Sequence, residues 1–301
     1  MSFLTKTCFF ILLSLFSSTL FSQEHKLLSQ YNDSLSSLQH KIGKATDDSI
    51  RQTLNHQFRN MLKRAIALPG SYSYPFDSLK KLARLTSPDG AFRIYNWNLP
   101  VTDGSNQYYC FMQIRSKENK HNYSILELND GSDSIVDPEH TTLSASNWYG
   151  ALYYKIIAEK AGNAMIYTLL GWEGKNGSEM QKIIEILTFD NKGFPHFGKK
   201  IFNKYKDGKN TRVIFRYSPS ATMALRFEDQ AISKGKKYNA RTRTFGESHT
   251  KAHMIVCDRL VTVDAIEGKG MVIAPAGDVY DGFLFENGHW NFMQGVDARN
   301  H

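Results

Sequence analysis

The sequence predicts a mainly antiparallel β protein of the α+β class, with a helical hairpin at its N-terminus. We expect a large meander of about a dozen strands, either barrel-like or folded as two packed sheets. Apolar residues recur at helical spacings of three and four near the N-terminus, and the period changes to two from residue 87 onward. Fifteen Tyr and nineteen Phe also favour strands, because flat rings pack well on a pleated surface.

The segment 1–22 differs from the rest of the chain. Lys6 is its one charged residue, and an apolar run from Cys8 to Phe21 ends beside the small residue Ser22. A basic start, a short apolar core and a small exit residue are typical of a secretory signal peptide. A membrane-spanning helix needs roughly 20 apolar residues, so an uncleaved anchor is the less favoured alternative. We expect cleavage near residue 22 and a periplasmic or secreted protein.

Residues 24 to 67 predict the helical hairpin, because two apolar stripes recur at helical spacing around a break at Gly43 and Lys44. The stripes must bury against each other or against the sheet that follows. An oligomerisation coil is the alternative, although the heptads are few. We therefore divide the mature chain into an N-terminal helical region, 23–85, that packs on an antiparallel β domain, 86–301.

Strand-like runs follow the helices in order. Asn287-Gly288 is the strongest hairpin signal, because both turn residues tolerate positive φ. The stretch 229–252 is basic and weakly apolar, and we expect an exposed loop there before a strand near 253–263. The other predicted strands are 92–97, 106–115, 121–128, 149–158 paired with 163–170, 181–189 with 195–202, 212–217 with 222–228, and 279–286 with 289–296.

Charge and cysteine content limit the classes of function. Lys and Arg total 37 against 29 Asp and Glu, a net charge of +8. Solubility and a weak affinity for anionic surfaces explain this balance, and export argues against a nucleic-acid partner. Cys110 and Cys257 remain after processing, too few for a disulfide framework. We favour two buried free thiols over a single bridge.

Two motifs near the centre of the chain resemble known sites without matching them. The run 193–200 nearly spells a phosphate-binding loop, but Lys200 replaces the required Ser or Thr and the run links strands. His249 and His253 have the spacing of a helical zinc pair without the intervening Glu. A metal shared by His253 and Cys257 is an alternative to simple packing. We predict no metal site and no cofactor.

Five acidic residues gather in one stretch of an otherwise basic chain. Their spacing is not that of a helix–loop–helix calcium site, so a solvated turn is favoured over a surface calcium site. They are Glu127, Asp130, Asp133, Asp137 and Glu139.

Aromatic residues at strand ends are the most suggestive feature for ligand binding. Aromatic rims can stack on sugars or line an apolar cup, while the alternative is that these rings fill a wide core. Our candidate binding residues are Tyr95, Trp97, Trp172 and Trp290.

Two runs carry a resemblance to a known group. They are Ser-Pro-Asp-Gly-Ala-Phe-Arg-Ile-Tyr-Asn-Trp-Asn at 87–98 and Tyr-Thr-Leu-Leu-Gly-Trp at 167–172. Together with the signal segment ending Phe21-Ser22-Gln23, they resemble uncharacterised exported proteins of Bacteroidota. The resemblance implies an envelope or secreted location and carries over no activity.

The function expected from these observations is a non-catalytic, exported binding or interaction module of the cell envelope. Its partner would be a glycan, a lipid or an envelope protein. No catalytic motif stands out, so whether the chain is an enzyme stays open. The alternative function is a hydrolase acting on an envelope or extracellular polymer. Acids or His converging in one cleft would favour the enzyme, and an apolar or aromatic cup would favour binding.

Overall fold

A computed structural model describes residues 3–116, 118–119, 122–175, 177–239, 241, 243–264 and 270–297. Within these residues the chain forms two α-helices and fifteen strands, and the strands make three sheets. The predicted mainly antiparallel β fold behind a helical hairpin is confirmed. Of the two predicted arrangements, packed sheets are correct, since no sheet in the described chain closes on itself, and there are three sheets rather than two.

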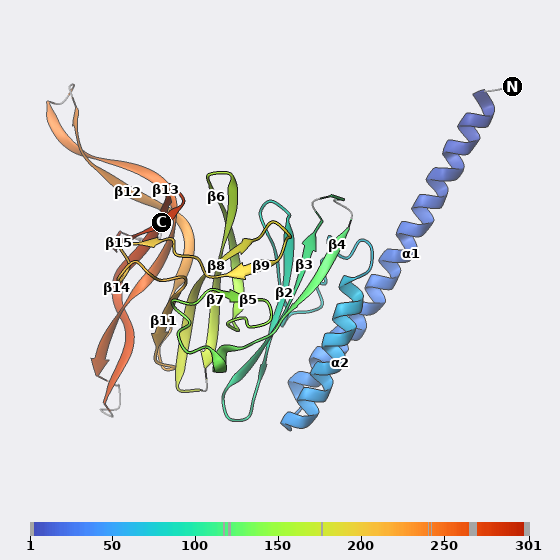
Figure 1. Ribbon diagram of the computed structural model, residues 1–301, viewed down its shortest axis with the longest axis horizontal. Helices are drawn as coiled ribbons and strands as arrows, with labels where there is room; N and C mark the ends of the chain where they lie inside the picture. The colour runs from blue at the N-terminus through green and yellow to red at the C-terminus, as the bar shows by residue number, and fades with distance from the viewer. Residues whose placement is uncertain are drawn as a thin grey trace.

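The two helices are α1 (Phe3–Lys44) and α2 (Asp48–Ile66), which lie side by side (Figure 1). Helix α2 begins at a cap, because the side chain of Asp47 accepts a hydrogen bond from the amide of Ile50 at 3.0 Å. No helix within the described chain is both long enough and apolar enough to cross a membrane.

The first sheet has the order β1-β2-β3-β4, and every pairing in it is antiparallel. One face of this sheet carries the helical hairpin. Phe58 and Leu62 of α2 are buried there against Trp97 of β2 and Phe111 of β3. The strands are β1 (Ala83–Thr86), β2 (Phe92–Pro100), β3 (Asn106–Arg115) and β4 (Tyr123–Leu128).

The second sheet lies at the centre of the molecule, with the order β5-β9-β8-β7-β6 and β11 also paired to β8. The third sheet has the order β10-β15-β14-β13-β12, with β10 parallel to β15. The central strands are β5 (Leu143–Ser144), β6 (Leu152–Ala161), β7 (Ala164–Lys175), β8 (Glu179–Phe189), β9 (Pro195–Phe197) and β11 (Val213–Tyr217). Those of the third sheet are β10 (Phe202–Asn203), β12 (Leu225–Asn239), β13 (Thr244–Asp264), β14 (Met271–Glu286) and β15 (His289–Val296).

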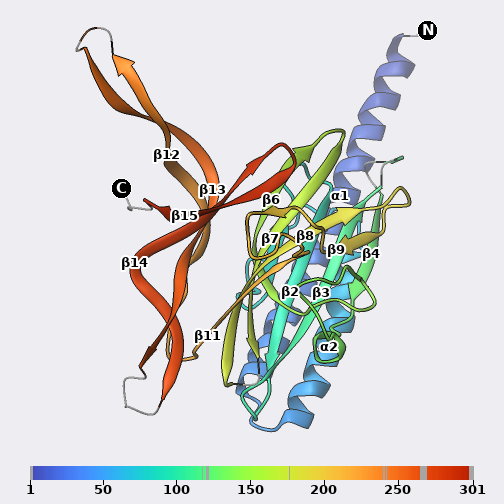
Figure 2. The same cartoon turned by 60° about the vertical axis from the view of Figure 1, so that its left-hand side comes forward.

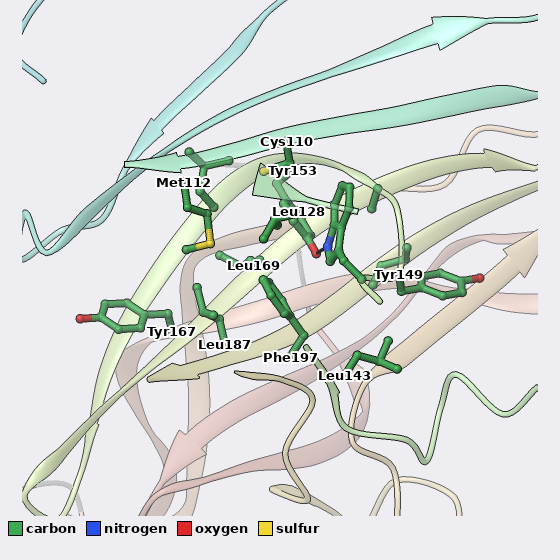
Figure 3. Close-up of a cluster of buried hydrophobic side chains, with 14 of the residues drawn as sticks. Cys110, Met112, Leu128, Leu143, Tyr149, Tyr153, Tyr167, Leu169, Leu187 and Phe197 are labelled. Carbon is green, nitrogen blue, oxygen red and sulfur yellow. Dashed lines mark hydrogen bonds between the residues drawn. The ribbon is translucent and has the colours of Figure 1, made fainter. Parts of the chain in front are cut away.

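Two apolar clusters cover the two faces of the central sheet, so the molecule is a stack of helical hairpin, first sheet, central sheet and third sheet (Figures 1 and 2). Figure 3 shows part of the cluster between the first and central sheets, where Met112 of β3 lies over Leu169 and Leu187. The other cluster joins Ile184 of β8 to Phe283 of β14. Most of the apolar residues are therefore used in contacts between layers.

Cys110 and Cys257 are free and buried, as predicted. Cys110 belongs to the cluster between the first and central sheets, whereas Cys257 belongs to the cluster on the other side of the central sheet. Burial raises the pKa of both thiols well above its usual value. The central sheet lies between them, so the alternative of one bridge does not fit this fold.

The C-terminal hairpin is confirmed at the predicted turn. Asn287 and Gly288 both have positive φ, at 53° and 80°, and Glu286 pairs with His289 across them.

The predicted pairing of 212–217 with 222–228 is wrong. Strand β11 pairs with β8 in the central sheet, while β12 pairs with β13 in the third. Both faces of β11 are covered, because Ile214 packs in one cluster and Val213 in the other. The turn after Tyr217 thus carries the chain from one layer to the next instead of closing a hairpin.

The loop predicted at 229–252 is also wrong, because most of this stretch belongs to β12 and β13. The two strands pair as far as Asn239 with Thr244, and the hairpin runs away from the stacked sheets (Figure 1). Where no sheet or helix packs on a two-stranded ribbon, the ribbon has no face to bury. Its sequence then lacks the alternation of apolar and polar residues that marks a strand. The predicted strand 195–202 is similarly split into the short strands β9 and β10.

Candidate functional site: an acidic cleft

The four aromatic residues predicted to bind a ligand are not brought together. Tyr95 and Trp97 are buried between the first sheet and the helical hairpin. The Tyr95 hydroxyl donates to Gln113 Oε1 at 2.9 Å, and the Trp97 indole donates to Asn55 Oδ1 at 2.9 Å. Both rings have their polar atoms satisfied inside the protein, as buried aromatic residues usually do.

Trp290 is buried in the cluster between the central and third sheets, where its indole N–H donates to Thr168 Oγ1 at 2.9 Å. Trp172 on β7 is half-buried and is the one candidate with access to solvent. Three of the four rings are thus core residues in two different layers, and a ligand cannot reach them in this structure. The four residues therefore do not form an aromatic rim together.

A cleft of about 630 Å³ lies where β3 begins and β4 ends. Its volume is in the range of pockets that hold small molecules. The walls come from the first residues of β3, the end of β4, the loop 129–134, Arg59 of α2 and Glu173 of β7. The cleft is therefore built by three of the layers, with residues from the helical hairpin, the first sheet and the central sheet.

Asp130 fixes the loop that forms one wall. Its carboxylate accepts hydrogen bonds from Ser132 Oγ at 2.6 Å, from the Gly150 amide at 3.2 Å and from the Tyr108 amide at 3.4 Å. The backbone at Gly150 approaches so closely that an added Cβ would lie 2.3 Å from Asp130 Oδ2. The Gly131 amide also donates to the Trp148 carbonyl at 2.8 Å. The loop is held in place before any ligand arrives.

Tyr108 and Glu173 are deeply buried polar members of the cleft, each 4% exposed. The Gly174 amide donates to Tyr108 Oη at 2.7 Å, so the phenol keeps its own proton to donate. Burial raises the pKa of Tyr108, and the nearby carboxylates of Glu173 and Asp130 act in the same direction. Tyr108 is consequently a neutral hydroxyl donor throughout the physiological pH range.

Carboxylates outnumber basic groups around the cleft. Glu127, Asp130, Asp133 and Glu173 line it, against the single guanidinium of Arg59. Arg59 forms an ion pair with Glu127, to which Lys63 also lies 3.6 Å away. Negative charge in a partly enclosed cleft attracts cations and repels anions. Further polar residues of the lining are Asn106, Gln107, Asn129, Ser105, Ser132 and Ser134.

The predicted acidic patch is divided by the fold. Glu127, Asp130 and Asp133 line the cleft, as stated above. Asp137 instead pairs with His140 at 2.9 Å, and Glu139 binds Lys206 at 2.7 Å and Arg216 at 3.2 Å. No group of three or more His, Cys, Asp or Glu side chains in the described ranges is placed to hold a metal ion. The calcium alternative therefore has no such group of ligands there.

The metal predicted as an alternative for His253 and Cys257 is not supported by their positions. His253 is exposed and pairs with Asp229 at 2.5 Å, while Cys257 is buried and its thiol contacts the Asp281 carbonyl at 3.5 Å. The phosphate-loop-like run 193–200 contains strand β9 and no helix start, as the sequence predicted.

Sequence reasoning missed Tyr108, Glu173 and the Gly150 contact. The acidic composition around residue 130 signalled one wall, but nothing local connects residue 108 with residue 173.

Comparison of the chain with protein-family models, with curated proteins and with solved structures gives no match.

Proposed function

We propose that the protein is an exported binding module of the cell envelope whose acidic cleft takes a polar ligand that carries a positive charge. The observation that carries the proposal is the cleft itself, with four lining carboxylates and a loop held by Asp130. The expected signal peptide and the resemblance to exported proteins support the location.

The lining groups favour hydroxyl-rich ligands with an amine. Carboxylates accept hydrogen bonds from hydroxyl and ammonium groups, and the amide N–H groups of Gln107 are donors beside them. The Tyr108 hydroxyl is a further donor near the carboxylates of Glu173 and Asp130. An amino sugar, free or within a glycan, is the simplest ligand class that combines these features. Pre-organisation of the loop lowers the entropy that binding must overcome.

A hydrolase is the second candidate, and one observation favours it. The carboxylates of Asp130 and Glu173 line the same cleft, and glycoside hydrolysis uses two carboxyl groups across the scissile bond. Binding is preferred because the Asp130 carboxylate already accepts four hydrogen bonds that hold the loop. If the protein released reducing ends from an amino-sugar polymer and Glu173→Gln abolished that release, catalysis would replace binding as the proposed function.

The test is a thermal-shift screen of residues 23–301 against amino sugars, neutral sugars, lipids and divalent metals with and without EDTA. Among the residues whose burial is described, Leu28 is the first in the chain that is buried in a core. Residues 23–301 therefore retain the described cores. A ligand that binds the native state raises the melting temperature by mass action. We expect the shift with amino sugars.

Asp133→Asn and Asp137→Asn make a matched pair for this screen. Both residues are exposed, but Asp133 lines the cleft and Asp137 pairs with His140 outside it. We expect Asp133→Asn to reduce the shift and Asp137→Asn to preserve it. Equal shifts in both variants, or no shift with any sugar, would remove the cleft as the binding site.

A further inference from the structure

The hairpin of β12 and β13 extends beyond the stacked sheets in both views of the molecule (Figures 1 and 2). Its strands pair with each other out to Asn239 and Thr244, whereas β13 pairs with β14 from Met254 onward. From the residue before Met254 back toward Thr244, β13 pairs with β12 and not with β14, so the described backbone there is a two-stranded ribbon. We call residues 229–253 the arm, because Glu228 pairs with Met254 at its base. A ribbon of two strands buries little and gains little stability from packing, so its projection needs another explanation.

Charge is concentrated in the arm. Six Lys or Arg stand against Asp229 and Glu247 between residues 229 and 253, a net of +4 in a chain whose total is +8. Arg241, Arg243 and Lys251 are exposed, and so is His253 near the base. The basic residues of the arm are Lys234, Lys236, Lys237, Arg241, Arg243 and Lys251.

An aromatic ring lies at the tip of this basic element. Phe245 is 68% exposed, two residues from Arg243 and opposite Tyr238 in the strand register. A large apolar ring that stays this exposed buries little of its surface in the fold. Aromatic and basic residues together are typical of elements that bind at the membrane–water interface, where the ring enters the headgroup region and the cations meet lipid phosphates.

We infer that the arm docks the protein on a membrane surface rich in anionic lipids, with Phe245 inserted among the headgroups and the arginines beside the phosphates. This inference does not depend on the ligand of the cleft. Basic residues near an anionic bilayer each contribute about a fivefold increase in partitioning, and the attraction is screened by salt. A two-stranded ribbon also fits the major groove of DNA, but an exposed phenyl ring at the tip favours lipid.

The experiment is co-sedimentation of residues 23–301 with vesicles of phosphatidylcholine alone or with about 30% phosphatidylglycerol. We expect binding to the anionic vesicles, weak binding to the neutral ones, and release in about 0.5 M salt. The variant Arg241→Glu/Arg243→Glu should weaken binding roughly 25-fold or more, because two attractions become repulsions. Its matched control is Lys199→Glu/Lys200→Glu, the same charge change at two exposed lysines of the body.

The ring is tested with a second matched pair. Phe245→Ser should weaken vesicle binding, and Met271→Ser should not, although Met271 is 62% exposed in the same sheet. Circular dichroism of each variant confirms that the fold is retained. Equal binding to neutral and anionic vesicles, or equal loss in the arm and control variants, would overturn the inference. Binding of a short DNA duplex through the arm, without vesicle binding, would overturn it in favour of nucleic acid.

Discussion

Glu185 and Arg212 form an ion pair at the centre of the molecule, and Glu185→Gln tests whether it is essential to the fold. Their side chains are 1% and 0% exposed, and Arg212 Nε lies 2.7 Å from Glu185 Oε2. The guanidinium also donates to the carbonyls of Pro138, Thr141 and Phe197, which ties the loop before β5 and the end of β9 to the central sheet. Burial raises the pKa of Glu185, and Arg212 opposes that rise.

Glu185→Gln keeps the shape of the side chain and removes its charge, so the guanidinium stays buried without a counter-charge. Breaking a buried pair in this way costs about 3–5 kcal/mol. With a urea dependence of about 3 kcal/mol per molar, the unfolding midpoint should fall by about 1–1.7 M. Urea denaturation followed by tryptophan fluorescence measures the change.

Arg212→Met should cost more than Glu185→Gln, because it leaves a buried carboxylate and three carbonyls without their donor. The control is Asp207→Asn, which breaks the exposed pair with Lys209 at 3.8 Å and should leave the midpoint unchanged. A loss below about 1 kcal/mol in Glu185→Gln would refute the reasoning that the buried charge needs its partner.

Three further predictions concern the buried cores and the loss of stability at low pH. Burial raises the pKa of Asp89, but hydrogen bonds from two hydroxyls and from backbone amides outweigh burial and hold that pKa below its usual value. Its stabilisation is therefore present above about pH 4 and lost as pH falls through the folded-state pKa, so Asp89→Asn should flatten the decline of the urea midpoint below pH 4. An unchanged slope would contradict this. Cys110 and Cys257 should resist a thiol reagent in the native protein and both react in denaturant, whereas rapid native labelling would show that the layers open. Trp290→Ala should cost about 3–5 kcal/mol in urea denaturation and Trp172→Ala clearly less, and equal losses would contradict their different burial.

Local signals in the sequence predicted the elements better than their partners. Asn287-Gly288 defines its own turn, because both residues adopt the positive φ that a tight hairpin needs. The strand at β11 was found, but its partner was not, since period-two alternation does not identify which sheet a strand joins. The ribbon of β12 and β13 was missed because backbone pairing, and not a buried face, defines it.

The candidate site was predicted in part for a similar reason. An acidic stretch is visible in the sequence, and it forms one wall of the cleft. Tyr108 and Glu173 meet through the packing of the first sheet on the central sheet, which is a property of the assembled layers. Three of the four aromatic candidates are buried because large rings fill the space between layers well, as Trp97 and Trp290 do in two different cores.

The measurement that tests the central claim most directly is isothermal titration calorimetry of residues 23–301 with glucosamine and with glucose. The two sugars differ by one amine in place of a hydroxyl, so the comparison isolates the charge that the cleft carboxylates would recognise. We expect tighter binding of glucosamine than of glucose, lost in Asp133→Asn combined with Glu127→Gln and weakened by salt. Equal affinity for both sugars, or heat of binding that survives in this double variant, would contradict it.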